Sequence, residues 1–443
     1  MSAVFLKSIG CRTNQEEMAA LGPILAGHGH CVVDTCEDAD VVVVNTCVVT
    51  AATEAKTRRY ISGLARMRPG VRICVTGCMA QLSPSDVRKR LGATWVVGNA
   101  HKNDILSILG DSSGGVYHSD SANGTTSELS LVNRLPAPGG FGRTRFFLKI
   151  QEGCDCRCAY CIVPLVRGPS RSAAFADVQT VFRRALDAGC REIVLTGTHI
   201  GQYADGKKRT CADLVTALAE TPGDFRLRLS SLDPRDLSDQ ILDMVGSHPR
   251  VCRHLHLSVQ SLSPGVLAAM NRPLPDFETF MDRLSSFRRL NPCVGLGGDF
   301  IVGFPSETEA QAEATRRSVA EAGFSYGHVF RYSRRPGTAA ALRQGQIDEK
   351  EKNARSCALR ETLDKCHGAF IAAVSGDVHT ILVESTGPAS GLASNYLRME
   401  VPSCTSQKNV WLRVTIAGLN PASGRCIAVP AKDGVIKDHG RKA

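Results

Sequence analysis

The 443-residue sequence lacks any hydrophobic run long enough to cross a lipid bilayer. Its richest apolar segment, residues 41–52, is short and is interrupted by Asn45, Thr46 and Thr50. The first ten residues also lack the basic stretch and apolar run of an export signal. We therefore expect a cytoplasmic protein that has no membrane partner.

The chain also lacks the short, cysteine-dense character of a secreted disulfide scaffold, because its 18 cysteines are spread over the whole length. In a cytoplasmic chain, clustered cysteines indicate metal binding or catalysis. Apolar residues make up 43% of the sequence, which is too many for a disordered chain, and the length suits two or three domains. The net charge of +10 favours an acidic partner such as nucleic acid, although solubility alone also accounts for such an excess.

The order of predicted elements gives an α/β protein with three parts. Residues 1–110 alternate apolar strands with helices, which predicts a parallel α/β domain, and residues 111–143 are rich in Gly, Ser and Pro, as in a linker. Residues 144–370 contain six further strand–helix repeats, which predict a partial (β/α)6 barrel. Short strands within residues 371–435 predict a small antiparallel β-barrel. The strands that we expect in the first two parts are 4–7, 41–44, 72–76, 146–150, 192–196, 225–230, 254–257, 296–302 and 328–331.

One cysteine cluster lies directly after the predicted strand 146–150. Cys154, Cys158 and Cys161 follow a C-x3-C-x2-C spacing, at the end of a strand where active sites of parallel β/α folds gather. Three thiolates can hold three irons of a [4Fe-4S] cluster and leave the fourth iron open to a substrate. Zinc, which needs a fourth ligand, is the alternative. Because this loop cannot easily wrap one tetrahedral ion, we favour the cluster and interpret Cys156 as a non-ligand.

Three more cysteines, Cys11, Cys47 and Cys78, each lie a few residues beyond a predicted strand of the first part. The carboxyl ends of parallel strands meet at one edge of a sheet, so we expect these thiols to converge. Such a trio again suits an iron–sulfur cluster with one open iron. The alternative is three unrelated loop thiols.

The C-x3-C-x2-C loop resembles the radical S-adenosylmethionine (SAM) superfamily. Together with the three N-terminal cysteine motifs, it makes the chain similar to the methylthiotransferases over nearly its whole length. The C-terminal region is similar to the TRAM domain, an RNA-binding module of that family. Further matching segments, in the expected order, are 195–203, 254–261, 299–308 and 330–338.

The resemblance implies a methylthiotransferase N-terminal domain (1–110), a radical SAM core (144–370) and a TRAM domain (371–435). It also implies a transferase that uses SAM and two [4Fe-4S] clusters, a radical cluster on Cys154, Cys158 and Cys161 and an auxiliary cluster on Cys11, Cys47 and Cys78. In the family, one SAM methylates a sulfur at the auxiliary site. A second is reduced to a 5′-deoxyadenosyl radical, which activates an aromatic C–H bond where the methylthio group is inserted. A flavodoxin- or ferredoxin-like electron donor and a sulfur donor are the implied partners.

Five further residues are candidates for contacting SAM, and we assign none of them as catalytic. Gly197 and Gly201 lie in a strand-end loop and would let the backbone approach the cofactor, unless they only form a turn. Ser230, Gln260 and Asp299 lie at strand positions and would hydrogen-bond the ribose or the amino-acid part, unless their hydrogen bonds are structural.

The resemblance leaves three substrates open. Segments 151–154, 158–164, 165–168, 254–256 and 328–330 are most similar to the branch that modifies C2 of N6-threonylcarbamoyladenosine, next to the anticodon in the stem-loop of tRNA. Segments 10–14 and 155–157 depart from that branch. The alternatives are isopentenyladenosine in tRNA and an aspartate of a ribosomal protein. A structural iron–sulfur RNA-binding protein is the non-enzymatic alternative.

Overall fold

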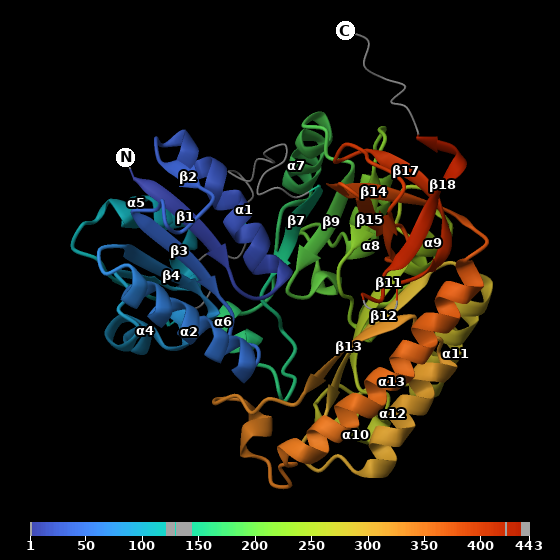
Figure 1. Cartoon of the computed structure of the whole chain (residues 1–443). Coiled ribbons are helices and arrows are strands. Elements are labelled where there is room, and N and C mark those ends of the chain that lie inside the picture. Colours follow the sequence, from blue (N-terminus) through green and yellow to red (C-terminus); the bar gives the residue numbers. More distant parts are fainter. Residues whose placement is uncertain (1, 121–128, 130–143, 421–422, 436–443) are drawn as a thin grey trace.

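The computed structural model describes residues 2–120, 129, 144–420 and 423–435. Figure 1 shows an N-terminal α/β part (blue), a central half barrel of strands and helices (green to yellow), and a C-terminal β-barrel (red) on the far side of the half barrel. This arrangement confirms the predicted fold class. Among the described residues, no helix combines the length and the apolar character that are needed to span a membrane.

The N-terminal part is a six-stranded sheet in the order β2-β1-β3-β4-β5-β6, and every pair in it is parallel. Its central strand β3 is buried along its whole length, because four consecutive valines favour a strand covered on both faces. The sequence did not indicate the three-residue strands at the β5–β6 edge, and β6 lies in the range expected to be a linker. The strands are β1 (Ala3–Ser8), β2 (Cys31–Val33), β3 (Val41–Thr46), β4 (Arg72–Gly77), β5 (Trp95–Val97) and β6 (Gly115–Tyr117). The helices are α1 (Arg12–Gly27), α2 (Ala51–Met67), α3 (Cys78–Leu82), α4 (Pro84–Arg90) and α5 (Ile105–Gly110).

The half barrel consists of two parallel groups of strands, β10-β9-β7 and β11-β12-β13, with the two-residue β8 antiparallel to β7. Isolated bridges from Leu227 to Val251 and from Leu232 to Leu257 join the two groups. The six expected parallel strands are therefore present, and the ring stays open. The strands are β7 (Arg145–Glu152), β8 (Arg171–Ser172), β9 (Glu192–Gly197), β10 (Arg226–Leu229), β11 (His254–Gln260), β12 (Gly295–Val302) and β13 (Tyr326–Arg331). The helices are α6 (Val163–Arg167), α7 (Phe175–Asp187), α8 (Cys211–Ala219), α9 (Asp239–Ser247), α10 (Pro264–Ala269), α11 (Phe277–Leu290) and α12 (Glu309–Glu321).

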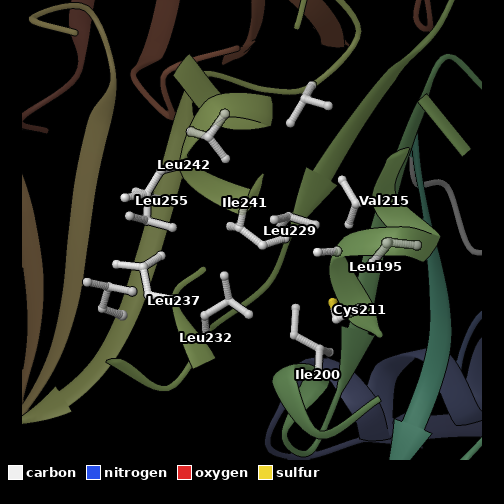
Figure 2. Packing of buried hydrophobic residues seen from close by; sticks show 14 of the residues in the cluster. Leu195, Ile200, Cys211, Val215, Leu229, Leu232, Leu237, Ile241, Leu242 and Leu255 are labelled. Carbon is white, nitrogen blue, oxygen red and sulfur yellow. The ribbon is translucent and has the colours of Figure 1, made fainter. Parts of the chain in front are cut away.

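The period-two alternation of the strands separates an apolar outer face from a polar inner face. Figure 2 shows the outer core, in which Leu195, Leu229 and Leu255 of neighbouring strands meet Val215 of α8 and Ile241 of α9. In each of these strands, the residues next to the leucine point the other way, into the lumen of the half barrel. The lumen therefore receives the polar side chains that the outer core excludes.

The C-terminal barrel closes in the order β14-β15-β16-β18-β17. Its β16–β18 pair is parallel, and the other four pairs are antiparallel. One parallel pair is unavoidable, because strand direction cannot alternate completely around a ring with an odd number of strands. The preceding helix α13 (Glu349–Val374) packs on α12 and β13, and its last turn places Phe370, Ile371 and Val374 in the core of this barrel. The strands are β14 (Val378–Thr386), β15 (Ala389–Ala393), β16 (Arg398–Val401), β17 (Trp411–Leu419) and β18 (Cys426–Val435).

Buried ion pairs attach the C-terminal barrel to the half barrel. The Nε atoms of Arg226 and Arg228 each donate to Glu192 at 2.7 Å, and none of the three side chains is more than 8% exposed. The other guanidinium nitrogens donate to backbone carbonyls of the C-terminal barrel, including that of Leu392 at 2.6 Å. Burial alone would raise the pKa of Glu192, but the two guanidiniums lower it to about 2.

A Glu192→Gln variant is expected to lose about 3–5 kcal/mol of unfolding free energy at neutral pH, because both arginines stay buried without a counter-charge. Arg226 lies 4.9 Å from the centre of the Trp411 ring, so Trp411 fluorescence in a Trp95→Phe background reports on this interface. The depressed pKa makes the stabilisation complete above about pH 4.5 and removes it as pH falls towards 2. Urea titrations across that range should therefore show the difference between the two proteins shrinking as pH falls.

A matched control is Asp239→Asn, which removes one partner of an ion pair with Arg283 whose Asp239 side chain is 88% exposed. That change should cost no more than about 1 kcal/mol. Equal effects of the two substitutions at neutral pH would contradict the importance of the Glu192 pairs.

Candidate functional site

The three N-terminal cysteines lie at one edge of the N-terminal sheet. Cys11 directly precedes α1, Cys47 directly follows β3, and Cys78 is the first residue of α3, after β4. The strands β1, β3 and β4 are neighbours and parallel, so their ends meet. Gly10, at φ 125°, approaches so closely that a Cβ there would lie 2.3 Å from the Cβ of Cys47. The structure thus places the three thiols at one sheet edge, where Cys11 and Cys78 influence the pKa of Cys47, but their sulfurs are not all within 4.8 Å of one another. That they hold one cluster stays a prediction.

Side-chain hydrogen bonds tie these three loops to one another. Asn14 Nδ2 donates to the carbonyls of Ile9 (3.2 Å) and Thr46 (2.9 Å), and Asn14 Oδ1 accepts from the Cys11 thiol at 3.4 Å. The Thr46 hydroxyl donates to the carbonyl of Thr76 at 2.6 Å. The positions of the thiols are therefore fixed by the protein itself.

The charges around this trio suit a metal cluster. Burial, followed by the proximity of Cys78 and Cys11, raises the pKa of Cys47 to about 12, and Arg167 opposes that rise. Burial also raises the pKa of Cys78, against the influence of Arg167 and Lys102. Thiols with such pKa values lose their protons when a metal binds. Three converging sulfurs beside buried cations fit a [4Fe-4S] cluster with three protein ligands.

The second cysteine loop begins at the end of β7. Cys158 Sγ accepts from Arg272 Nη1 at 3.5 Å, and the amide of Cys161 donates to the carbonyl of Cys158 at 3.0 Å. Burial and the neighbouring Cys158 raise the pKa of Cys161 to about 12. Three sulfurs on one tight loop, with an arginine directed at one of them, are a donor set that fits the expected radical cluster.

The sequence did not single out His199, which lies just beyond β9 next to this loop. Its Nδ1 is 3.4 Å from Cys154 Sγ and 3.7 Å from Cys156 Sγ, and its Nε2 is 2.5 Å from an Asp236 carboxylate oxygen. Hydrogen bonds from Cys154 and then from His199 lower the pKa of Cys156 to about 4. A histidine in a strand-end loop was the available signal, but its partner Asp236 is 37 residues away. Ligand atoms of Cys154, Cys156 and His199 lie within 4.8 Å of one another, whereas the sulfurs of the predicted trio Cys154, Cys158 and Cys161 are not all that close. The interpretation of Cys156 as a non-ligand stays a prediction.

A cavity of about 240 Å³ lies beside the second cysteine loop and the loop that follows β3. Its lining includes Tyr160 and Cys161 from the second loop, and Val49 and Thr50, which lie two and three residues after Cys47. A molecule bound there would therefore contact Cys161 and the loop that carries Cys47. The remaining lining residues are Ile162, Val163, Gln260, Asp299, Ile301, Phe330, Arg331, Tyr332 and Ser333.

The structure separates the five candidate SAM contacts into two groups. Gln260 and Asp299 line the cavity, and Gln260 has a φ of 65° where the β11–β12 register shifts. The identities of the other three residues are explained by the packing or hydrogen bonding around them. A Cβ on Gly197 would lie 2.8 Å from the Gln151 carbonyl, and one on Gly201 would lie 2.2 Å from Asp236.

Ser230 is buried, and its amide donates to the Leu195 carbonyl at 3.0 Å. Contact of any of these five residues with SAM stays a prediction.

A buried charge cluster connects the two cysteine sites. Arg167, at the end of the helix that begins two residues after Cys161, is 4% exposed. It donates to Glu17 (3.0 Å), Glu152 (2.7 Å) and Asn14 (2.6 Å). In the same helical segment, Ile162 and Val166 pack into the N-terminal core with Val48 and Cys78. The segment that follows the second cysteine loop is thus part of the domain that carries the first trio.

Comparisons with known proteins agree with this geometry. Residues 3–98 match a family described as uncharacterized protein family UPF0004, and residues 148–319 match the radical SAM superfamily. The chain is 34% identical to the threonylcarbamoyladenosine tRNA methylthiotransferases MtaB of Thermotoga maritima and of Bacillus subtilis, over 90% of this chain and 91% and 90% of theirs. It is 32% identical to the tRNA-2-methylthio-N(6)-dimethylallyladenosine synthase of Cereibacter sphaeroides, over 96% of this chain and 99% of that one.

A solved structure supports the fold alone. The radical SAM methyltransferase TsrM from Kitasatospora setae, with cobalamin and a [4Fe-4S] cluster bound, superposes with a TM-score of 0.58. The match covers 77% of each chain at 14% identity. The two family matches occur in the expected order, and the relatives are more than 30% identical over nearly the whole chain. Both findings agree with a chain that has two cysteine sites. The chain therefore belongs to the tRNA methylthiotransferase family of radical SAM enzymes.

Proposed function

We propose that this enzyme places a methylthio group on C2 of N6-threonylcarbamoyladenosine beside the anticodon of tRNA, using SAM and two [4Fe-4S] clusters. The observation that carries the proposal is the cavity that is lined by Cys161 of the second loop and by Val49 and Thr50 of the loop that carries Cys47. Insertion of a methylthio group at an unactivated C–H bond needs a radical source and a sulfur source on the same substrate atom. A cavity lined by Cys161 and by Val49 and Thr50 of the loop after β3 suits that requirement.

The two trios have separate roles in this proposal. Cys154, Cys158 and Cys161 would hold the cluster that supplies the 5′-deoxyadenosyl radical from SAM. Cys11, Cys47 and Cys78 would hold the auxiliary cluster, at which the sulfur is delivered. The protein's own contribution is to fix the two sites across one cavity and to limit water there. A one-electron donor and a sulfur donor complete the reaction.

The choice of substrate rests on the relatives. Two relatives at 34% identity are named for threonylcarbamoyladenosine, and one at 32% is named for the dimethylallyl base. The net charge of +10 and the C-terminal β-barrel suit a tRNA partner, whose phosphates a basic surface attracts. Isopentenyladenosine is the second candidate, favoured by the coverage of the dimethylallyl relative.

Mass spectrometry of tRNA nucleosides from cells lacking this protein tests the proposal. The expected result is loss of 2-methylthio-threonylcarbamoyladenosine together with accumulation of its unmethylthiolated precursor. A plasmid-borne copy should restore the product. Loss of the isopentenyl product instead would overturn the substrate assignment. Unchanged tRNA together with an unmodified ribosomal-protein aspartate would indicate the protein-modifying branch.

A further inference from the structure

The lumen of the half barrel carries a layer of polar side chains next to the cavity. Five side chains of this layer lie on the inner face of their strands. They are His254 and His256 of β11, Asp299 of β12, and Tyr326 and His328 of β13. Ring contacts of 5.5–6.4 Å join the four ring side chains. Asp299 also lines the cavity. Gly297 leaves the room for this layer, since a Cβ there would lie 2.2 Å from the Tyr326 ring.

The hydrogen bonds within this layer form a chain in which each group donates to the next. Burial lowers the pKa of His254 well below its usual range, so this imidazole is neutral and has one N–H. Its Nδ1 has no hydrogen-bond partner among the described residues, and its Nε2 lies 2.7 Å from the Tyr326 hydroxyl. The proton is assigned to Nε2, because a buried donor is rarely left unpaired. His254 therefore donates to Tyr326.

The Tyr326 proton is then free for His256, whose Nδ1 lies 2.8 Å away. His256 Nε2–H in turn donates to Asp299 at 3.1 Å. The chain of donors ends on the Asp299 carboxylate, at the wall of the cavity. His256 and Tyr326 therefore hold Asp299 as a fixed acceptor, which still has lone pairs for a bound molecule.

Two residues from outside the half barrel extend this polar layer beyond the cavity lining, and with them the layer forms one polar wall. Tyr396, from the loop after β15, stacks on His254 at 4.3 Å and on Tyr326 at 5.0 Å between ring centres. Arg12, the residue after Cys11, donates from Nη2 to the Tyr396 hydroxyl at 2.6 Å. Tyr396 has a φ of 73°, which is uncommon for a non-glycine residue and is held by the surrounding contacts. Arg12 is thus held at the lumen between the auxiliary cysteine site and the polar layer.

The accessible groups of this wall offer one cation, one anion and one neutral imidazole. Arg12 is only half-buried and uses one of its five N–H groups on Tyr396, whereas His328 is exposed. Protein atoms around the imidazole partly desolvate it and so lower the pKa of His328, and Arg12 contributes to the lowering. Ligand atoms of His256, Asp299 and His328 lie within 4.8 Å of one another, but the positive charge of Arg12 disfavours a metal cation there. The wall suits an organic group that carries both an anion and hydrogen-bond donors.

We propose that this wall is the binding site for the polar N6 substituent of the substrate base. The Arg12 guanidinium takes the carboxylate of a carbamoyl amino acid, and Asp299 accepts from its N–H or hydroxyl group. The inference rests on the proposed function, because a threonylcarbamoyl group has these functions and an isopentenyl group has none of them. Arg12 and Asp299 are binding residues here and act on no reacting bond.

Fluorescence anisotropy with anticodon stem-loops tests this site separately from turnover. Three RNAs are compared at one salt concentration, carrying threonylcarbamoyladenosine, its threoninamide analogue without the carboxylate, or unmodified adenosine. The wild-type enzyme should bind the carboxylate RNA about 10-fold or more tightly than the other two. Arg12→Gln should lose that preference and leave the affinity for the threoninamide RNA unchanged, whereas Arg12→Lys should retain part of it.

Arg59→Gln is the matched control, because it removes one exposed arginine from α2. It should lower the affinity for all three RNAs by the same factor. Iron content is measured for each variant, since Arg12 is next to Cys11. Equal loss of affinity for all three RNAs in Arg12→Gln, with full iron, would overturn the inference. The proposed function fails by a different result, in which wild-type enzyme forms no methylthiolated product from the threonylcarbamoyl RNA.

Discussion

A Cys47→Ala enzyme is expected to keep cleaving SAM reductively and to form no methylthiolated product. Cys47 is 4% exposed, and its sulfur and Cβ pack directly against Gly10, so the thiol is held inside the protein. Losing one of three protein ligands should release the auxiliary cluster, which lowers the iron content from about eight to about four per chain. The second cysteine loop lies on separate elements and keeps its three thiols.

The measurements are iron content, 5′-deoxyadenosine release and product formation in the same anaerobic preparation. Cys74→Ala is the matched control, because Cys74 is a fully buried thiol on β4 that packs in a different hydrophobic cluster from Cys78. The control should keep its full iron and its product. If Cys47→Ala kept both its iron and its methylthiolation, the auxiliary role of the N-terminal trio would be wrong.

The parts of the site that sequence patterns predict are those set by strand ends. A loop after a parallel strand has only one edge at which to emerge, so Cys11, Cys47 and Cys78 lie at the same sheet edge without any long-range information. The same rule places the second cysteine loop at the end of β7. The order of apolar strands and helices was likewise enough to predict the α/β class and the half barrel. These predictions depend on local patterns and on strand order.

The missed residues depend instead on contacts between distant segments. Arg12 and Tyr396 are 384 residues apart and meet only because the N-terminal and C-terminal parts both reach the lumen. Arg167 and Glu17 are 150 residues apart. No periodicity marks such partners, and a lone arginine is usually a solvated surface residue. The three-residue strands β5 and β6 were missed for a different reason, because they are too short for a reliable alternation.

Arg167→Met is expected to lower the unfolding free energy by about 3–5 kcal/mol, because it leaves Glu17 and Glu152 buried with less positive charge. Both carboxylates are 5% exposed. Burial raises the pKa of Glu152, but Lys149 and then Arg167 bring it down to about 2. The wild-type pairing therefore keeps both groups ionised at neutral pH. Chemical denaturation followed by circular dichroism measures the loss.

The same substitution should also affect the auxiliary site more than the radical site. Arg167 donates to Asn14, which holds the loops that carry Cys11 and Cys47, and its charge opposes the raised pKa values of Cys47 and Cys78. Iron analysis and electron paramagnetic resonance should show preferential loss of the auxiliary cluster, with 5′-deoxyadenosine release retained. A merely structural role would lower both cluster signals together.

Two further variants separate buried charge from lost packing. Glu17→Gln combined with Arg167→Met should recover none of the stability, since Lys102 and Lys149 also pair with Glu17 and would lose that partner. Arg58→Met removes an arginine that is 34% exposed and paired with Glu54 and Asp86, so it should cost no more than about 1 kcal/mol. If Arg167→Met lowered the unfolding free energy no more than Arg58→Met, the buried charge cluster would not be needed to hold the two cysteine sites in place.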